Sequence, residues 1–287
     1  MTVQKKLREL LNRKEATLLP GAVNAMFAHV VEDLGFEAVY ATGAGISNTQ
    51  LGLADVGLIS MGEVLNHVRY MCEAVQIPLI CDIDTGFGNA LNVYRTVRQF
   101  EKAGCAGLQI EDQVTPKKCG HFAGKAVVDV EEMEIKIKAA LDARQSDVVI
   151  IARTDAIAVE GFDRAIERAQ RYREAGADMI FVEAPRSMEE IQAIPKLVAA
   201  PLIINMVEGG LTPLLNRRQV SELGYTFMLH ANFPLKAAVK GIQDALIHLR
   251  DSGQTEDIQD KIITTDERNR LTKYEHLQEL QRRYKLL

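Results

Sequence analysis

Four times along the chain, a predicted helix end is followed by a glycine and then by a short apolar run. The four phrases are DLGFEAVY, KAGCAGLQI, EAGADMIFV and ELGYTFML, and their glycines are Gly35, Gly104, Gly176 and Gly224. Glycine just past a helix adopts a left-handed conformation at little cost, so it ends the helix cleanly. Repetition of one junction predicts repeated helix–strand units, the basis of an α/β fold.

Eight short runs are predicted to be strands. Most are apolar at consecutive positions, as in parallel strands covered on both faces. They are Leu18–Gly21, Ala38–Ala41, Leu79–Asp82, Leu108–Glu111, Val148–Ala152, Met179–Val182, Leu202–Asn205 and Thr226–Leu229. Amphipathic segments lie between them, as expected of covering helices. Eight strands favour a closed (β/α)₈ barrel of the TIM type. The pattern alone does not exclude an open doubly wound sheet, although no G-x-G-x-x-G follows the first strand.

The length of 287 residues suits one such barrel, which typically needs about 250 residues. We therefore expect a catalytic barrel over residues 1–250 and a helical extension over 251–287. The extension begins with a polar link, DSGQTED, and continues as a predicted helix from about Asp266 to Leu287. No strand follows for it to cover, so its apolar stripe is expected to pack on its own barrel or on a neighbouring subunit.

Composition narrows the functional classes. The net charge is −5 and the positive charges are scattered, so the footprint of a nucleic-acid-binding protein is missing. No run approaches the roughly 18 apolar residues of a membrane span. The N-terminus lacks the apolar core of a signal peptide, so a cytoplasmic location is expected. None of the four cysteines forms a C-x-x-C pair, and Cys72, Cys81 and Cys105 are predicted to be core residues.

Acidic residues gather where predicted strands end. Asp82 and Asp84 follow the third strand, and Glu111 ends the fourth. In α/β barrels the active site lies at these ends. Carboxylates brought together repel unless they are protonated or neutralised by a cation. An oxygen-only cluster suits Mg²⁺ or Mn²⁺ rather than zinc. The plainer reading is that one of these acids caps a helix or pairs with a lysine.

The segment Lys117-Lys118-Cys119-Gly120-His121 combines positive charge, a thiol and an imidazole. Positive charge favours the thiolate, and histidine exchanges protons near neutral pH. Such a loop can supply acid–base chemistry when it closes over a bound anion. The alternative is a solvated basic loop with a chance cysteine.

Two further features are candidates for holding an anion. Arg153 ends the fifth strand and is predicted to clamp a carboxylate, with a structural ion pair as the alternative. Gly43, Ala44 and Gly45 form a predicted small-residue turn whose backbone N–H groups can hold an oxyanion. Short glycine turns are common, so this signal is weak by itself.

With these features, the chain resembles members of the isocitrate lyase and phosphoenolpyruvate mutase superfamily. The likeness covers nearly the whole chain, and K-K-C-G-H after I-E-D-Q is its most specific part. It runs from PGAVNAMFAHVVEDLGFEAVYATGAG through DIDTGFGNALNVYRTVRQFEKAG and IEDQVTPKKCGHFAGK to IARTDA, FVEAP and NMVEGGLTP. The resemblance implies a barrel enzyme that binds a small carboxylate substrate. It also implies a homotetramer with the last helices swapped between paired subunits.

The resemblance also implies roles for individual residues. Magnesium would be held directly by Asp82 and largely through water by Asp55, Asp84 and Glu111. The amides of Gly43 and Ala44, with Arg153, would hold the substrate's carboxylate. Cys119 would be the general acid on a gating loop. The remaining matches are Lys117, Gly120 and His121 on that loop, and Tyr40, Thr42, Glu183 and Asn205 around the substrate.

The resemblance leaves the substrate open. The intact K-K-C-G-H favours cleavage of a carbon–carbon bond in a 2-hydroxy- or 2-keto-dicarboxylate. Methylisocitrate lyases tend to have Arg and Thr where this chain has Phe122 and Val207, and the strand-eight end here is His230-Ala231-Asn232. These departures favour a 2-alkylmalate such as dimethylmalate, or oxaloacetate, over a tricarboxylate. A phosphonomutase of the carboxyphosphonoenolpyruvate type is the alternative enzyme, and a non-catalytic binding barrel is the alternative of another class.

Overall fold

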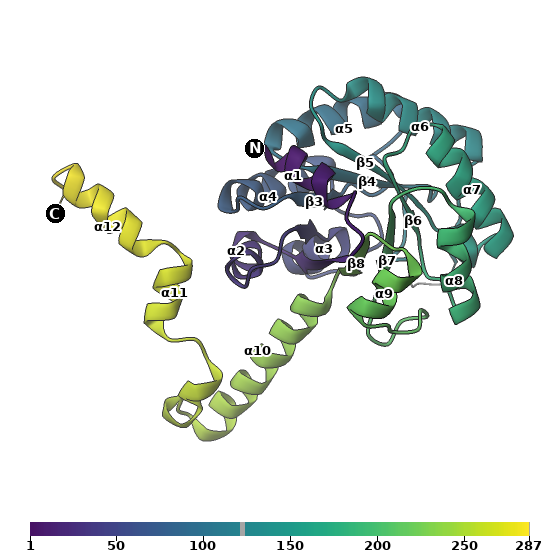
Figure 1. Cartoon of the computed structure of the whole chain (residues 1–287). Coiled ribbons are helices and arrows are strands. Elements are labelled where there is room, and N and C mark those ends of the chain that lie inside the picture. Colours follow the sequence, from purple (N-terminus) through teal and green to yellow (C-terminus); the bar gives the residue numbers. More distant parts are fainter. Residues whose placement is uncertain (121–123, 287) are drawn as a thin grey trace. The chain divides into compact units, whose positions relative to one another are not determined.

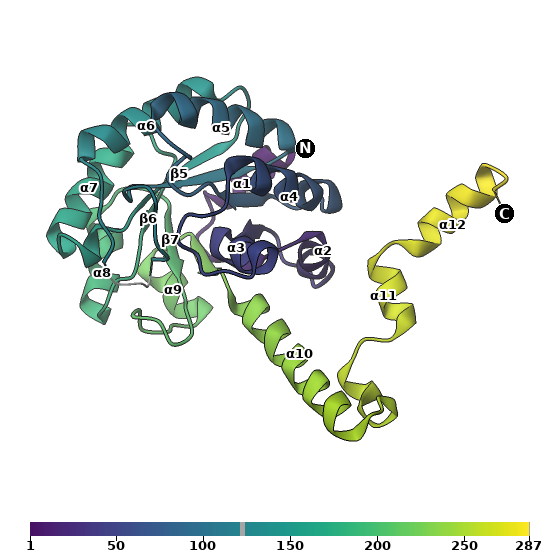
Figure 2. The same cartoon turned by 180° about the vertical axis from the view of Figure 1, so that it is seen from behind.

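The protein folds around a closed barrel of parallel strands, seen in a computed structural model that describes residues 1–120 and 124–286 (Figures 1 and 2). Each strand pairs with the next, and the last pairs with the first. The strands are β1 (Thr17–Ala22), β2 (Val39–Ala41), β3 (Leu79–Asp82), β4 (Gly107–Glu111), β5 (Val149–Thr154), β6 (Met179–Val182), β7 (Leu202–Asn205) and β8 (Phe227–His230). The predicted (β/α)₈ barrel is confirmed, and the pairing of β8 with β1 excludes the open sheet.

Helices surround the barrel, as Figure 1 shows. They are α1 (Val3–Leu10) before the first strand, then α2 (Ala25–Asp33), α3 (Gly43–Leu51), α4 (Met61–Ala74), α5 (Ala90–Ala103), α6 (Val130–Ala143), the short η1 (Ala156–Ala158), α7 (Phe162–Glu174), α8 (Met188–Leu197) and α9 (Arg217–Leu223). Local chemistry sets their ends. Ser60 opens α4 with a capping box, and Gly104 closes α5 in a left-handed conformation with φ 105°.

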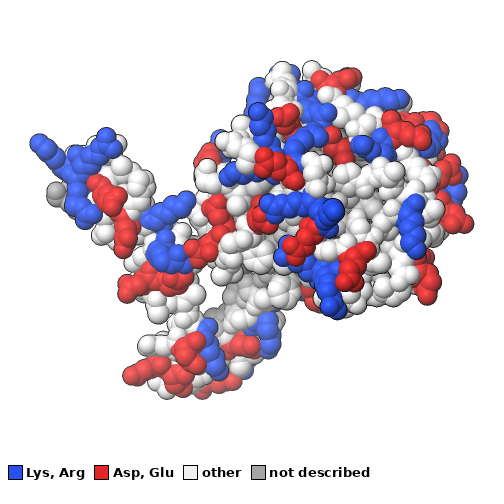
Figure 3. Space-filling view, viewed as in Figure 1, with Lys and Arg blue, Asp and Glu red and all other residues white. Residues whose placement is uncertain are grey.

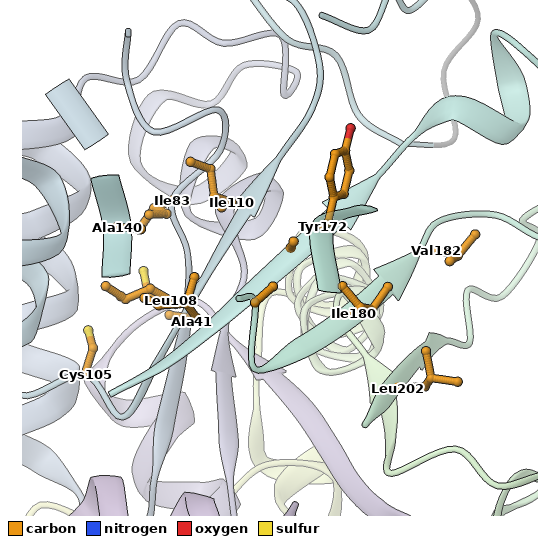
Figure 4. Close-up of a cluster of buried hydrophobic side chains, with 14 of the residues drawn as sticks. Ala41, Ile83, Cys105, Leu108, Ile110, Ala140, Tyr172, Ile180, Val182 and Leu202 are labelled. Atoms are coloured by element: carbon orange, nitrogen blue, oxygen red, sulfur yellow. The ribbon is translucent and has the colours of Figure 1, made fainter. Parts of the chain in front are cut away.

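The hydrophobic core has two layers. The outer layer joins strands to helices and includes Leu108, Ile180 and Tyr172, all labelled in Figure 4. The inner layer fills the barrel and includes Phe181 and Phe227. Consecutive apolar residues in each strand supply both layers, because successive side chains point to opposite faces.

Helix α1 covers the end of the barrel at which the strands begin. Its Leu7 and Leu10 belong to the inner cluster, and Arg8 donates to the carbonyl oxygen of Val148 just before β5. This end is therefore sealed by apolar side chains. Polar side chains gather at the other end, where the strands finish, which is the usual place for the active site of such a barrel.

The chain divides into two compact units, Met1–Pro234 and Leu235–Leu287. The second contains most of α10 (Phe233–Ser252), then η2 (Glu256–Lys261), α11 (Thr265–Leu271) and α12 (Tyr274–Arg283). Within the described part of the chain, α10 has no buried side chain. The domain boundary predicted at residue 250 falls inside this helix, and it stays a prediction.

The stretch predicted to be helical from about Asp266 to Leu287 is helical over most of its described length, but it is interrupted. Two helices occupy this stretch, and Lys273 between them has a left-handed φ of 54°. The hydroxyl of Thr272 donates to the carbonyl oxygen of Arg268 (3.0 Å), a local bond that competes with helix continuation. Leu287 lies outside the described residues.

On the face shown in Figure 3, basic and acidic side chains are interspersed. No helix among the described residues is long and apolar enough to cross a membrane. Cys81 and Cys105 are buried as predicted, whereas Cys72 is only partly buried.

Candidate active site

Three buried carboxylates lie together at the ends of β3 and β4. Asp82 ends β3 and is 6% exposed, Asp84 is 5% exposed, and Glu111 ends β4 and is 1% exposed. A Cβ atom on Gly43 would lie 2.9 Å from Oδ2 of Asp82 and 3.1 Å from Oδ1 of Asp84. Both aspartates therefore face the start of α3, which is the common side that their spacing predicts.

Asp84 has a strained backbone. Its φ is 49°, in the left-handed region, which non-glycine residues adopt at a cost of roughly 1–3 kcal/mol. Its N–H donates to Oδ1 of Asp82 (3.0 Å), and its carboxylate pairs with Lys117 (2.8 Å). Ala184, directly after Glu183, is also left-handed, with φ 56°. Strain of this kind clusters at functional sites, where surrounding contacts enforce it.

Lys117 lies among the carboxylates. Its ammonium contacts Asp55 at 2.7 Å and Asp84 at 2.8 Å, and its side chain is only 4% exposed. Burial by itself lowers the pKa of a lysine, but Asp84, Glu111, Asp82 and Asp55 raise the pKa of Lys117 well above its usual value. This lysine is therefore charged and binds to the acid cluster instead of projecting from a solvated loop.

The cluster still holds more negative than positive charge. Burial raises the pKa of Asp84 to about 6, raises that of Asp82, and raises that of Glu111 well above its usual value. The Oε1 atom of Glu111 is buried without a hydrogen-bond partner in residues 1–120 and 124–286. An added cation would relieve both the repulsion and this unsatisfied oxygen. Within the same residues, no group of three or more His, Cys, Asp or Glu side chains forms a ready metal cage.

Arg153, at the end of β5, connects the acid cluster to a second set of polar groups. Its Nε lies 3.4 Å from Glu111 and 2.9 Å from Asp155, and its guanidinium lies over the ring of Phe181. The ion pair named as the alternative is therefore present, whereas the predicted role of Arg153 in holding a substrate carboxylate stays a prediction. On the next two strands, the side-chain amide of Asn205 at the end of β7 donates to Oε1 of Glu183, which follows β6 (3.4 Å).

The loop segment with Cys119 lies directly against this site. The N–H of Cys119 donates to the carbonyl oxygen of Asp55 (3.1 Å). A Cβ atom on Gly120 would collide with Nη2 of Arg153 and lie 2.9 Å from Cγ of Glu183. Any larger residue would have to displace the buried side chains of Arg153 and Glu183, so glycine suits this position. Cys119 is half-buried, and it lies at the site because Lys117 contacts the acid cluster and Gly120 lies against Arg153. His121 and Phe122 lie outside the described residues.

The predicted turn Gly43-Ala44-Gly45 is instead the first turn of helix α3. Thr42 caps it, accepting from the N–H of Gly45 (3.3 Å) and donating to Oδ1 of Asn232 (3.2 Å). The free N–H groups of a helix start and the helix dipole favour an anion. The anion-holding role proposed for these amides therefore has a stronger physical basis in a helix than in a turn.

Sequence reasoning missed Gln109 in the middle of β4. Its side chain faces the barrel interior, accepts from the hydroxyl of Tyr40 (2.7 Å) and donates to Oδ1 of Asp82 (3.4 Å). Tyr40, expected to line the substrate site, is thus also part of a chain that orients Asp82. A polar residue inside the apolar run LQI was the available signal.

A second network behind the site was also missed. Asp112 accepts from the N–H of Asp155 (2.9 Å) and from the hydroxyl of Tyr172 (2.8 Å). Arg168, on the same helix as Tyr172, lies 3.5 Å from Asp112. In the sequence, Arg168 lies on the charged face of α7, which the helical pattern predicts to be exposed to solvent. Only the packing of α7 on the barrel makes it a buried partner.

Comparison with known proteins gives this site a context. Residues 7–250 match the family model described as phosphoenolpyruvate phosphomutase. The chain is 45% identical over 285 residues to 2,3-dimethylmalate lyase from Eubacterium barkeri, covering 99% of each chain. It is 46% identical over 261 residues to 2-methylisocitrate lyase from Aeropyrum pernix, covering 91% of this chain and 84% of the relative.

Solved structures agree with these relatives. Oxaloacetate acetylhydrolase, in complex with the inhibitor 3,3-difluorooxalacetate, superposes with a TM-score of 0.93 at 33% identity, covering 98% of this chain and 96% of that one. Phosphonopyruvate hydrolase in complex with oxalate and Mg²⁺ superposes with a TM-score of 0.90 at 31% identity, covering 99% of both chains. These relatives are enzymes, so the non-catalytic binding barrel is set aside. The chain belongs to the phosphoenolpyruvate phosphomutase family and is an enzyme of the isocitrate lyase and phosphoenolpyruvate mutase superfamily.

Proposed function

We propose that this protein is a carbon–carbon lyase that cleaves a 2-hydroxy-dicarboxylate of the 2-alkylmalate type, such as 2,3-dimethylmalate, to an α-keto acid and a second carboxylate. One observation carries the proposal. The segment from Lys117 to Gly120 lies against both the acid cluster and Arg153, so a thiol adjoins the groups suited to a hydroxy acid. The 2,3-dimethylmalate lyase, similar over almost its whole length, supports the substrate class.

The residues divide the work by chemistry. Arg153 and the first amides of α3 bind the carboxylate next to the reacting carbon. The substrate hydroxyl gives its proton to a carboxylate of the acid cluster, the adjacent carbon–carbon bond breaks, and the hydroxyl carbon becomes the ketone of the α-keto acid. The other fragment leaves as a carbanion and takes the proton of Cys119. Gly120 brings the thiol near without a side chain to displace Arg153.

We propose Mg²⁺ as the cofactor, with Mn²⁺ able to substitute. The residues fit it, because Asp55, Asp82, Asp84 and Glu111 are buried oxygen donors whose repulsion a divalent cation relieves. In this proposal Asp82 binds the ion directly and the other three act largely through water. A bound divalent ion would stabilise negative charge on the substrate oxygens. The phosphonopyruvate hydrolase structure contains Mg²⁺.

Side chains near the far half of the substrate favour a small acid. His230 at the end of β8 lies 3.7 Å from Glu208 in the loop after β7. An acidic side chain here disfavours the third carboxylate of a tricarboxylate, because like charges repel. The side chain of Val207 has no polar group with which to bind a further carboxylate. Phosphonomutase activity is the second candidate, because the family model and one relative, a carboxyvinyl-carboxyphosphonate phosphorylmutase from Arabidopsis thaliana, are named for that chemistry.

The decisive test is substrate turnover with Mg²⁺. The panel contains 2,3-dimethylmalate, 2-methylisocitrate, isocitrate, oxaloacetate and phosphonopyruvate, with products followed by NMR. We expect pyruvate and propionate from 2,3-dimethylmalate, lost on adding EDTA. Oxalate from oxaloacetate would place the activity with acetylhydrolases, and phosphonate–phosphate rearrangement would replace the proposal by the mutase.

Two variants make this test specific. Cys119→Ser should abolish cleavage while leaving Mg²⁺ binding intact, whereas Asp82→Ala should abolish both. Isothermal titration with Mg²⁺ separates the two losses. Full activity of Cys119→Ser would remove the thiol from the mechanism even if the substrate is correct.

We also propose a homotetramer in which the C-terminal helices pack on neighbouring subunits, in the cytoplasm. The exposed apolar side chains of α10, among them Val239, Ile242 and Leu246, support the assembly, because such side chains are commonly covered by a partner. Four free thiols, two of them 3.9 Å apart at Cys72 and Cys105, support a reducing compartment.

A further inference from the structure

Lys125 is a buried cation to which the sequence analysis assigned no role. Its side chain is 1% exposed. Its ammonium donates to Oδ1 of Asp155 (2.8 Å) and to the carbonyl oxygen of Gly120. A buried ammonium is stable only when its N–H donors have partners. These two contacts therefore tie the loop segment that carries Cys119 to the end of β5.

Asp155 is shared between Lys125 and Arg153. It is fully buried, and Arg153 donates to both of its oxygens, at 2.9 Å to Oδ2 and 3.1 Å to Oδ1. Burial by itself would raise the pKa of this carboxyl, but Arg153 and Lys125 lower it to about 2. One ionised carboxylate thus fixes both the guanidinium expected to hold substrate and the lysine that holds the loop.

The backbone around Lys125 is anchored independently of the loop. Val114 donates to the carbonyl oxygen of Ala126 (2.9 Å), and Val128 donates to that of Asp112 (2.9 Å). Gln113 and Val127 form an antiparallel bridge. Lys125 therefore extends from a stretch paired to the end of β4. If its contact with Gly120 is lost, Cys119 keeps its hydrogen bond to Asp55 and Lys118 keeps those to Gln113, but Gly120 is no longer tied to the end of β5. The segment is then held from one side only, and its Gly120 end can shift.

We propose that Lys125 is a positioning residue that holds Cys119 and Gly120 in register with Arg153, through the carbonyl of Gly120 and the carboxylate of Asp155. The inference rests on the proposed function for the role of Cys119 as an acid, whereas the contact itself does not depend on the substrate. Without Lys125, Asp155 keeps both hydrogen bonds from Arg153, so the substrate clamp stays in place. Gly120 loses its link to β5.

The test compares the full-length protein with Lys125→Met in two measurements. The first is the rate at which iodoacetamide alkylates Cys119 without substrate, followed by mass spectrometry of its peptide. We expect this rate to rise by about fivefold, because the thiol gains access when its segment shifts. The second is steady-state kinetics, where we expect kcat to fall by about tenfold or more, with KM changed less than about threefold.

Lys136→Met is the matched control. Lys136 is equally buried, at 3% side-chain exposure, and pairs with Glu132 at 3.2 Å on α6. Its loss should change neither the alkylation rate nor kcat. If Lys125→Met does not fold, Lys125→Gln, whose shorter amide keeps a donor, should still raise the alkylation rate about twofold.

Alkylation at the wild-type rate in a folded Lys125 variant would overturn the inference. Because alkylation needs no substrate, the outcome is separate from the proposed function. Faster alkylation in a protein that turns over none of the panel would support the role of Lys125 in holding the loop and reject the lyase.

Discussion

At the scale of single residues, a glycine matters to the site as much as the charged side chains do, because it leaves room for them. Gly120 has Arg153 and Glu183 where a Cβ atom would be. This close approach lets the loop backbone reach the end of β5. The requirement is steric, and it differs from the left-handed conformation that glycine supplies at Gly104.

We predict that Gly120→Ala lowers kcat/KM by about a hundredfold, because a displacement of about 1 Å at reacting groups has effects of this size. Thermal stability should change little, because the loop is not part of the hydrophobic core. Gly62→Ala, in α4 with nothing within 4 Å of the added Cβ, is the control and should leave kinetics unchanged. Wild-type kinetics in Gly120→Ala would show that the loop tolerates displacement.

At the scale of elements, strand ends and one helix share a buried polar network. Asp112 after β4 connects the backbone of Asp155 after β5 to Tyr172 and Arg168 on α7. In Figure 4 the hydroxyl oxygen of Tyr172 lies above the labelled apolar side chains, such as Ile180. The helix therefore does more than cover the barrel, since it fixes the loop that carries Asp155.

We predict that Tyr172→Phe lowers the free energy of unfolding by about 1–3 kcal/mol, because Asp112 loses a hydrogen bond in a buried site. Urea unfolding measures the loss, and kcat should also fall because Asp155 supports Arg153. Tyr225→Phe removes a hydrogen bond to the carbonyl oxygen of Ile191 and should reduce stability without affecting kcat. Equal kinetic effects of both variants would contradict a special role for the Asp112 network.

At the scale of the whole molecule, the buried acids make stability depend on pH. Burial raises the pKa of Asp84 and of Asp112 to about 6. In the unfolded chain both titrate near about 3.9. Between these values the folded state binds more protons than the unfolded state, so stability falls as pH rises. Asp155, with a pKa of about 2, acts in the opposite sense: its contribution is complete above about pH 3.9 and is lost progressively as the pH falls from there through about 2.

We therefore predict that the protein in EDTA gains on the order of 2 kcal/mol of stability as pH is lowered from about 6.5 to about 4.5. Urea unfolding at a series of pH values measures this slope. Mg²⁺ should flatten it, because a bound cation favours the ionised acids. Stability that rises with pH over this window in EDTA would show that the acids are ionised and compensated without metal.

The C-terminal unit buries few side chains in its described residues: Ile258 in η2 is buried, whereas α10, α11 and α12 bury none. On α10, Ile242 is 57% exposed and Leu246 is 58% exposed, and they lie one turn apart on one face. We predict that the double variant Ile242→Glu, Leu246→Glu reduces the proposed tetramer to smaller species, as measured by light scattering coupled to gel filtration. Val3→Glu on α1 is not a suitable control, because its side chain packs on the barrel interior. Glu279→Gln on α12 is a suitable control and should leave the mass of the assembly unchanged. An unchanged mass for the double variant would exclude this face of α10 from the interface.

The amino-acid sequence alone favoured a barrel of eight strands and indicated where its site lies, and the pairing of β8 with β1 then excluded the open sheet. Apolar runs of strand length, separated by amphipathic stretches and glycine stops, leave few ways to bury both faces of eight strands. Polar residues after those runs must then meet at one end of the barrel. This is why Asp82, Glu111 and Arg153 were predictable from position alone.

The pairing of the charges could not be read from the sequence, because it depends on how the folded chain packs. Lys125, Asp155 and Gln109 come from distant stretches of the chain or from inside a strand, and nothing in their local pattern indicates a partner. Their roles arise because burial removes water and leaves each polar group to be satisfied by whatever the fold places beside it. The same reason applies to the tail, where a hydroxyl bond at Thr272 accompanies the end of a helix that periodicity alone would extend.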